Sequence, residues 1–144
     1  MFIPLNMRSA NAYKSVGVES AVLGADAHQM IGLLYEAVLK ALGVAKMAIQ
    51  NGDIPGKGQA IGRAVRLIDE GLKAVLNDAQ GGEIAANLRS LYDYCVLRLC
   101  EANLRSDLAM VEEVEGLVRP VADAWSQIRA EVTPRAASSL RGGV

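Results

Sequence analysis

The stretch GGEIAANLRSLYDYCVLRLCEANLRSD, from Gly81 to Asp107, carries the pattern that decides the fold. Apolar residues recur in it at intervals of three and four, so they share one face of a helix. The same stretch also carries tyrosines, cysteines and asparagines that a plain core helix does not need. They are compatible with a catalytic surface, a metal site or a groove that holds another chain. The apolar stripe comprises Ile84, Leu88, Leu91, Cys95, Leu99 and Ala102.

Three other stretches show the same helical spacing of apolar residues, and turn-forming sequences such as NGDIPGKG and AQGG separate them. Gly62 and Gly71 lie within otherwise regular helical sequence, which suggests that another backbone approaches closely there. Helices of this length joined by short connections predict an all-α, antiparallel up-down four-helix bundle. The four helices are expected at about residues 26–50, 57–78, 83–103 and 107–131.

The two ends of the chain are expected to lie outside this bundle. Residues 1–25 show no sustained period and contain Pro4, Gly17 and Gly24, which indicates an irregular N-terminal arm. Residues 132–144 are small and polar, which predicts a disordered tail.

Composition excludes several classes of function. The 15 basic and 16 acidic residues give a net charge of −1 without a basic run, so no nucleic-acid partner is expected. No apolar run is long enough for a membrane span, and the N-terminal sequence is too polar for a secretory signal. These features predict a cytoplasmic protein. Cys95 and Cys100 are five residues apart on one helix and point away from each other, so free thiols are expected.

Catalytic and cofactor chemistry is also unsupported. His28 is the only histidine, and the Glu-x-x-His pairs of carboxylate-bridged metal bundles are missing. No glycine-rich phosphate loop has the required spacing. The sequence therefore predicts no enzyme, no metal, no cofactor and no small-molecule substrate. A small helical enzyme would need Arg63, Arg66 or Arg98 in a pocket beside a carboxylate.

Apolar residues also lie beside the narrow stripes. Val65, Val75, Tyr92, Val96 and Leu97 widen the apolar face beyond a single core seam. This surplus has two interpretations, which periodicity leaves open: a wider core, or a solvent-facing groove that receives an amphipathic segment of a partner.

Four pieces of the sequence resemble the flagellar export chaperone family, FliS. They are NAYKSVGVESA, GADAHQMIGLLYEAVLKAL, GDIPGKGQAIGRAVRLIDEGLKAVLN and the opening stretch, and the resemblance runs from about Asn11 to Ile128. The pattern GGEIAxNLxxLYDYxxxxLxxAN is the most specific of them. The chain departs from the family at Ala27, where members usually carry proline. It also departs at Pro120, which predicts a kink between Gly116 and Pro120 in the fourth helix.

The resemblance implies a cytoplasmic chaperone that needs no ATP. Such a protein binds the disordered C-terminal segment of flagellin over its apolar surfaces, prevents premature polymerisation, and delivers the cargo to the flagellar type III export apparatus. The resemblance also implies that the N-terminal arm, which carries Tyr13, covers part of the groove and docks on a component of the export gate.

The residues expected to bind flagellin or another partner come from the apolar faces, the tyrosines and the asparagines. Asn87 and Asn103 could hydrogen-bond the backbone of a partner, or they could simply lie near helix ends. A rival function is a self-associating helical scaffold without a secretion cargo, and a homodimer in the absence of cargo is compatible with either function. The candidate partner-binding residues are Tyr13, Val65, Leu72, Asn87, Leu88, Leu91, Tyr92, Cys95 and Asn103.

Overall fold

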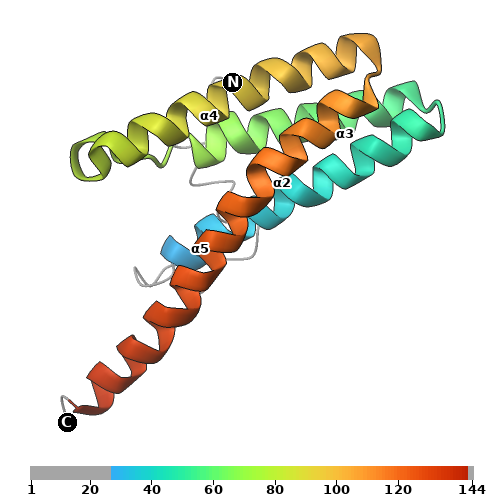
Figure 1. Ribbon diagram of the computed structural model, residues 1–144. Coiled ribbons are helices and arrows are strands. Elements are labelled where there is room, and N and C mark those ends of the chain that lie inside the picture. The colour runs from blue at the N-terminus through green and yellow to red at the C-terminus, as the bar shows by residue number, and fades with distance from the viewer. Residues whose placement is uncertain (1–26, 143–144) are drawn as a thin grey trace, which may run out of the picture.

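The computed structural model describes the backbone of residues 27–142 and the side chains of residues 27–128 (Figure 1). This part of the chain is all-α, as predicted, whereas the predicted N-terminal arm lies outside it. The elements are α2 (Ala27–Gln50), α3 (Ile54–Arg66), the π-helical segment η3 (Leu67–Leu72), α4 (Asp78–Arg105) and α5 (Leu108–Gly142).

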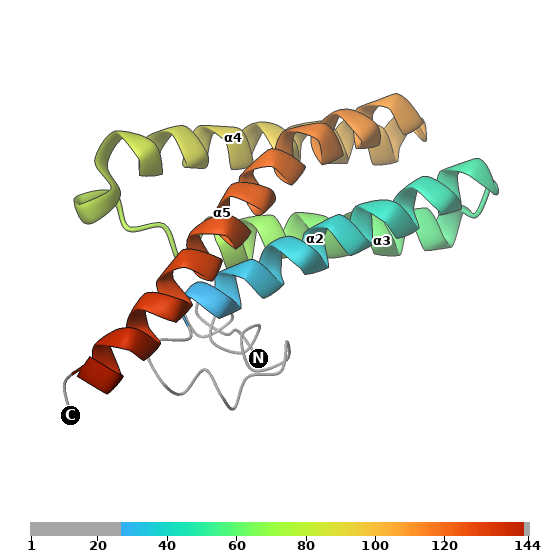
Figure 2. The same ribbon diagram turned by 60° about the horizontal axis from the view of Figure 1, so that its bottom comes forward.

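The helices form a four-membered ring in which consecutive helices are neighbours. α2 packs against α3 and α5, and α4 packs against the same two helices from the other side. Figure 2 shows α2 and α3 side by side and α5 crossing the bundle obliquely. α2 and α4 therefore face each other across a diagonal, a relationship that matters for the pocket described below.

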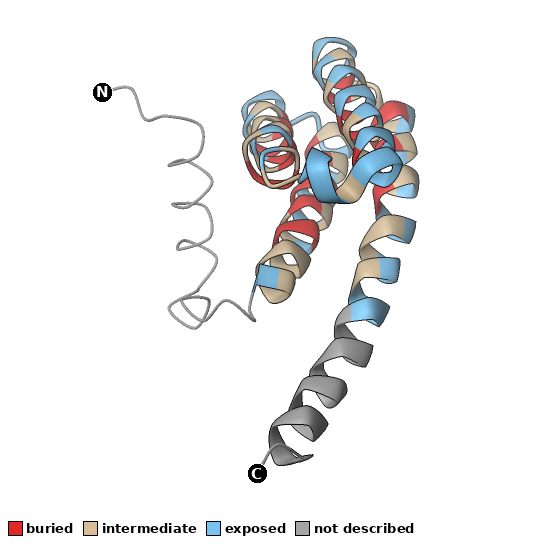
Figure 3. Cartoon of the chain, turned by 90° about the vertical axis from the view of Figure 1, so that its left-hand side faces the viewer, coloured by how far each residue is buried: buried red, intermediate tan, exposed pale blue. Residues whose placement is uncertain are grey.

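The core is built from aliphatic and small side chains, and Figure 3 shows the buried positions on the parts of the helices that pack against one another. Gly71 is closely approached, but by a side chain and not by the backbone that was predicted: a Cβ there would lie 3.1 Å from Cδ2 of Leu34. The same prediction is wrong for Gly62, where a Cβ would meet only Arg66 of its own helix. The largest fully buried side chains are Leu34, Val38, Leu42, Ile61, Ile68, Leu72, Cys95, Leu99, Val111, Val114 and Val118.

Capping side chains set helix boundaries that periodicity alone misplaced. α3 begins at Ile54 rather than at residue 57, because the Asp53 carboxylate accepts a hydrogen bond from the Gly56 amide at 3.0 Å and Pro55 suits the first helical turn. α4 begins at Asp78 rather than at residue 83, because the Asn77 side chain accepts from the Gln80 amide at 3.1 Å.

The backbone is irregular at two places, after α3 and within α4. In η3 the Lys73 amide donates to the Ile68 carbonyl at 2.8 Å, a bond across five residues. Within α4, Gly82 has φ 52° and ψ −124°, so the first turn of α4 is separated from the rest by a kink. The left-handed φ suits glycine, which has no Cβ.

α5 runs through Pro120 as one helix and continues beyond residue 131 to Gly142. Proline removes a hydrogen bond to the carbonyl four residues earlier, which belongs to Gly116. Both Pro120 and Gly116 are exposed, so water can satisfy that carbonyl. The proline therefore does not interrupt the helix at the predicted position. Within residues 27–142, none of the helices combines the length and apolar character that a membrane crossing requires.

Candidate binding pocket between α2, α4 and α5

An open pocket of ≈ 330 Å³ lies where α2, the connection after η3, the first half of α4, and α5 converge. Its lining is mostly apolar, and its side-chain polar groups are two amides, two tyrosine hydroxyls and the indole N–H of Trp125. None of the described residues that line it is charged. The lining residues are Ile31, Tyr35, Leu72, Val75, Leu76, Asn77, Gln80, Gly81, Ile84, Ala85, Leu88, Tyr92 and Trp125.

The pocket exists because regular helix stops early on one side of the bundle. η3 ends at Leu72, and the chain continues without α-helix until Asn77 caps α4. The kink at Gly82 then redirects α4 before its long helical run. As a result Ile84, expected in the core, is 71% exposed at the pocket rim. Its predicted burial is therefore wrong, because none of the described helices covers it.

Trp125 forms the α5 wall of the pocket and ties that helix to the start of α2. Its indole Nε1–H donates to the His28 carbonyl oxygen at 2.8 Å. The indole also stacks on the His28 ring, with centroids 4.1 Å apart and planes inclined by 13°. Tyr35 lies at a tilted angle to the same indole, at 6.4 Å.

A pair of tyrosines spans the diagonal of the bundle at the pocket. The hydroxyl oxygens of Tyr35 on α2 and Tyr92 on α4 lie 2.5 Å apart and share a hydrogen bond. The two residues are 3% and 2% exposed. Burial raises the pKa of both phenols, and that of Tyr92 more strongly because the neighbouring Tyr35 adds to the effect. Both therefore remain neutral hydroxyl groups at ordinary pH.

Three of the predicted partner-binding residues come together in this pocket: Leu72, Leu88 and Tyr92. Leu72 and Tyr92 are also buried in the core, whereas Leu88 is partly exposed.

The other predicted residues lie elsewhere. Val65 and Leu91 are partly buried and pack against the core outside the pocket. Cys95 is fully buried, and burial raises the pKa of its thiol to about 11. Asn87 is exposed, and Asn103 lies near the end of α4, where its carbonyl accepts a 2.8 Å hydrogen bond from Lys57. Tyr13 lies outside the described residues.

Several pocket residues were not predicted from the sequence. Trp125 and Ile84 were assigned to core stripes, and Ile31 and Tyr35 were not singled out. The only signal available was that all four lie on apolar helix faces, which core residues share. Their convergence depends on where η3 and α4 begin and end.

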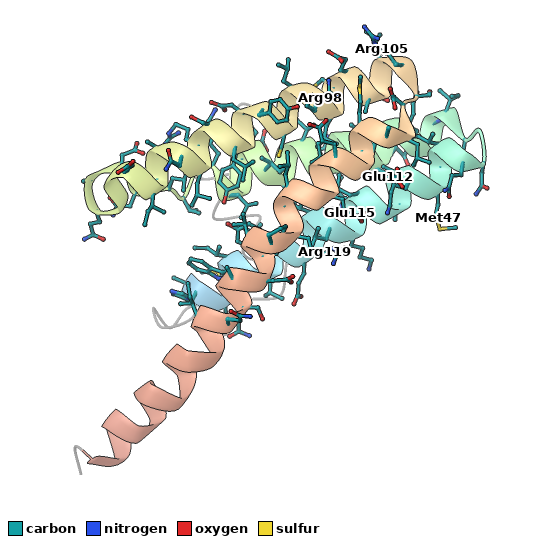
Figure 4. The ribbon with its side chains drawn as sticks, viewed as in Figure 1. Met47, Arg98, Arg105, Glu112, Glu115 and Arg119 are labelled. Carbon is teal, nitrogen blue, oxygen red and sulfur yellow. The ribbon has the colours of Figure 1, made fainter. Side chains whose placement is uncertain are left out.

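The arrangement that a small helical enzyme would need is not found among the described side chains. Arg63 and Arg66 are exposed. Arg98 pairs outside the pocket, with Glu113 at 2.9 Å and Glu101 at 3.2 Å. Figure 4 shows Arg98 on α4 facing the stretch of α5 that carries Glu112, Glu115 and Arg119. The same part of the chain contains no cluster of three or more residues that could hold a metal ion.

Comparison with known proteins identifies one family. Residues 9–132 match the family described as Flagellar protein FliS. The flagellar secretion chaperone FliS of Salmonella typhimurium is 50% identical over 117 residues, which cover 81% of this chain and 87% of the relative. The FliS chaperone of Escherichia coli is 42% identical over 120 residues, which cover 83% of this chain and 88% of the relative. The FliS chaperone of Bacillus subtilis is 35% identical over 116 residues, which cover 81% of this chain and 82% of the relative.

These relatives are named as secretion chaperones rather than enzymes, and a chaperone acts on a protein cargo. The match extends over most of the chain and includes every helix that lines the pocket. The chain thus belongs to the FliS family of flagellar secretion chaperones.

Proposed function

We propose that this protein is a cytoplasmic chaperone that binds the disordered C-terminal segment of flagellin. It prevents premature polymerisation and delivers the cargo to the flagellar type III export apparatus. The observation that carries the proposal is the open, uncharged apolar pocket with Ile84 exposed at its rim. Apolar recesses between helices are suited to the apolar face of an amphipathic segment.

The pocket can anchor such a segment but cannot enclose it. A volume of ≈ 330 Å³ accommodates a few side chains. Segments that fold on binding typically bury about 1,000–3,000 Å². The remaining contact would come from surface outside the pocket, and the amide groups of Asn77 and Gln80 can hydrogen-bond the backbone of the bound segment at its edge.

The N-terminal arm supplies the delivery step in this proposal. Its Tyr13 lies outside the described residues, and its role rests on the resemblance of NAYKS to the family. We propose that the arm covers part of the groove in the free protein, moves when cargo binds, and then docks on a component of the export gate.

A pull-down with this protein as bait, comparing full-length flagellin with flagellin that lacks its C-terminal segment, tests which part of the cargo is bound. The full-length protein should be retained and the truncated one lost. Leu88→Asp should abolish retention, because it places a charge in an uncharged pocket. Val44→Asp is the matched control, since Val44 is an exposed aliphatic residue outside the pocket. Circular dichroism should show unchanged helicity for both variants.

Equal retention of the truncated flagellin would contradict the proposal. Size-exclusion chromatography distinguishes the proposed chaperone function from the alternative function as a scaffold. A 1:1 complex with the flagellin segment supports a chaperone, whereas a tight homodimer that the segment leaves unchanged would support a scaffold.

A further inference from the structure

We infer that the Tyr35–Tyr92 pair is the specificity-determining polar group of the pocket, and that it donates a hydrogen bond to an amide carbonyl of the bound segment. This inference rests on the proposed function, because it concerns the same pocket. It adds a chemical requirement to that function: the cargo must bring a carbonyl acceptor together with its apolar side chains.

The inference follows from the number of hydroxyl hydrogens. Two phenols carry two O–H donors, and their mutual 2.5 Å hydrogen bond uses one of them. No other acceptor for either hydroxyl is found among the described residues. Tyr35 and Tyr92 both line the pocket, so we place the acceptor of the second hydrogen there. Water can fill that position in the free protein, and a ligand atom replaces it in the complex.

The absence of charge from the described lining selects the kind of acceptor. A carboxylate bound here would lose its hydration without gaining a cationic partner, which is strongly unfavourable. An amide carbonyl is neutral and needs only a donor. It can come from the backbone of the cargo or from an Asn or Gln side chain, and the pair presents the same donor to both.

The pairing of two hydroxyls also strengthens this donor. The hydroxyl that accepts from its neighbour is polarised and therefore donates more strongly in turn. Because burial raises the pKa of both phenols, the donor persists across the physiological pH range.

Calorimetric titration with a peptide of the flagellin C-terminal segment tests the inference. The double variant Y35F/Y92F should bind about tenfold more weakly than the wild type, because the peptide carbonyl loses its partner. Of the two single variants, the one that removes the donating hydroxyl should match the double variant, and the other should retain most of the affinity. Tyr94→Phe, outside the pocket, is the matched control and should stay within about twofold.

A second arm needs no flagellin. Trp125 is the only tryptophan and lines the pocket, so its fluorescence reports occupancy. N-benzylacetamide, an apolar ring that carries one amide, should bind the wild type more tightly than Y35F/Y92F. Peptides in which Asn and Gln are replaced by Leu then distinguish the two kinds of carbonyl. These peptides should lose affinity if a side-chain carbonyl accepts the hydrogen bond, and keep it if a backbone carbonyl does.

The outcomes separate the two proposals. If the flagellin peptide does not bind the wild type but N-benzylacetamide still discriminates the double variant, the proposed function fails and this inference stands. If N-benzylacetamide binds both proteins equally, or does not bind the wild type, the inference is overturned. If Y35F/Y92F does not fold, equal binding of the probe by both single variants and the wild type overturns it.

Discussion

Trp125 and His28 form the contact that closes the ring of helices beside the pocket. The indole stacks on the imidazole at 4.1 Å and donates to the His28 carbonyl at 2.8 Å, so one side chain of α5 makes both a packing contact and a hydrogen bond to the start of α2. The contact joins residues 97 positions apart in the chain. It also fixes the α5 wall of the pocket.

Replacing Trp125 should therefore affect stability and binding together. Trp125→Ala should lower the free energy of unfolding by about 2–3 kcal/mol, less than for a fully buried tryptophan because the indole is partly exposed. Trp125→Phe keeps an aromatic ring and should lose only the hydrogen bond, about 1 kcal/mol. Urea unfolding measures both changes. Unchanged stability in Trp125→Phe would contradict the assigned hydrogen bond, whereas equal losses in the two variants would contradict the packing contribution of the ring.

Replacing Lys57 should change the stability of the fold without changing the affinity for the proposed cargo. Lys57 is 6% exposed, and its ammonium group donates to the Asn103 carbonyl at 2.8 Å and to the Ser106 hydroxyl at 2.6 Å, at the negative end of α4. Lys57→Met should lower the free energy of unfolding by about 1–3 kcal/mol. Asn103 lies about 22 Å along the helix from Leu88, so affinity for the flagellin segment should not change. Unchanged stability, or a selective loss of affinity, would show that Lys57 has a different role.

The two tyrosines predict a loss of stability in alkaline solution. Burial raises their pKa above the ordinary value of 10.0. The unfolded chain therefore loses these protons first, and their contribution, complete below about pH 10, falls as the pH rises further. Y35F/Y92F should lose less unfolding free energy between about pH 9 and about pH 11 than the wild type. Cys95 is present in both proteins, so the difference isolates the tyrosines. Parallel pH profiles would contradict the assigned burial.

Gly62 and Gly71 should respond in opposite ways to the same substitution. Gly62→Ala should raise the free energy of unfolding by about 0.5–1 kcal/mol, because alanine favours helix and its Cβ meets only the end of the Arg66 side chain. Gly71→Ala should gain less or lose stability, because its Cβ meets Leu34 at 3.1 Å in the core. Thermal melting ranks the two. A larger gain for Gly71→Ala would mean that Leu34 can move aside.

Helical periodicity was sufficient for the fold but not for the ends of its helices. The spacing of apolar residues predicted all four helices, because each buries one face against its neighbours. Asp53 and Pro55 are recognisable start signals, yet their surroundings of glycine and asparagine favoured a turn. The π-helical segment has no periodic signature of its own, and Leu67–Leu72 continues the apolar stripe of α3 without a visible change.

The candidate site was predictable in kind but not in position. Leu88 and Cys95 belong to one stripe, yet Leu88 lines the pocket and Cys95 is fully buried. Nothing in their own side chains distinguishes them. What separates them is whether another helix lies opposite, and this depends on the early end of η3 and the oblique path of α5. A local pattern does not contain that information.

The π-helical segment makes this part of the chain tolerant of a change in length. A π-helical turn holds about one residue more than an α-helical turn, so a one-residue deletion within Leu67–Leu72 can restore the ordinary repeat while the chain on either side keeps its direction. The same deletion within Ile54–Arg66 would turn everything after it by about 100° and move Leu72 away from its present neighbours. The loss of one residue should therefore be accommodated at the π-helical segment and not in α3.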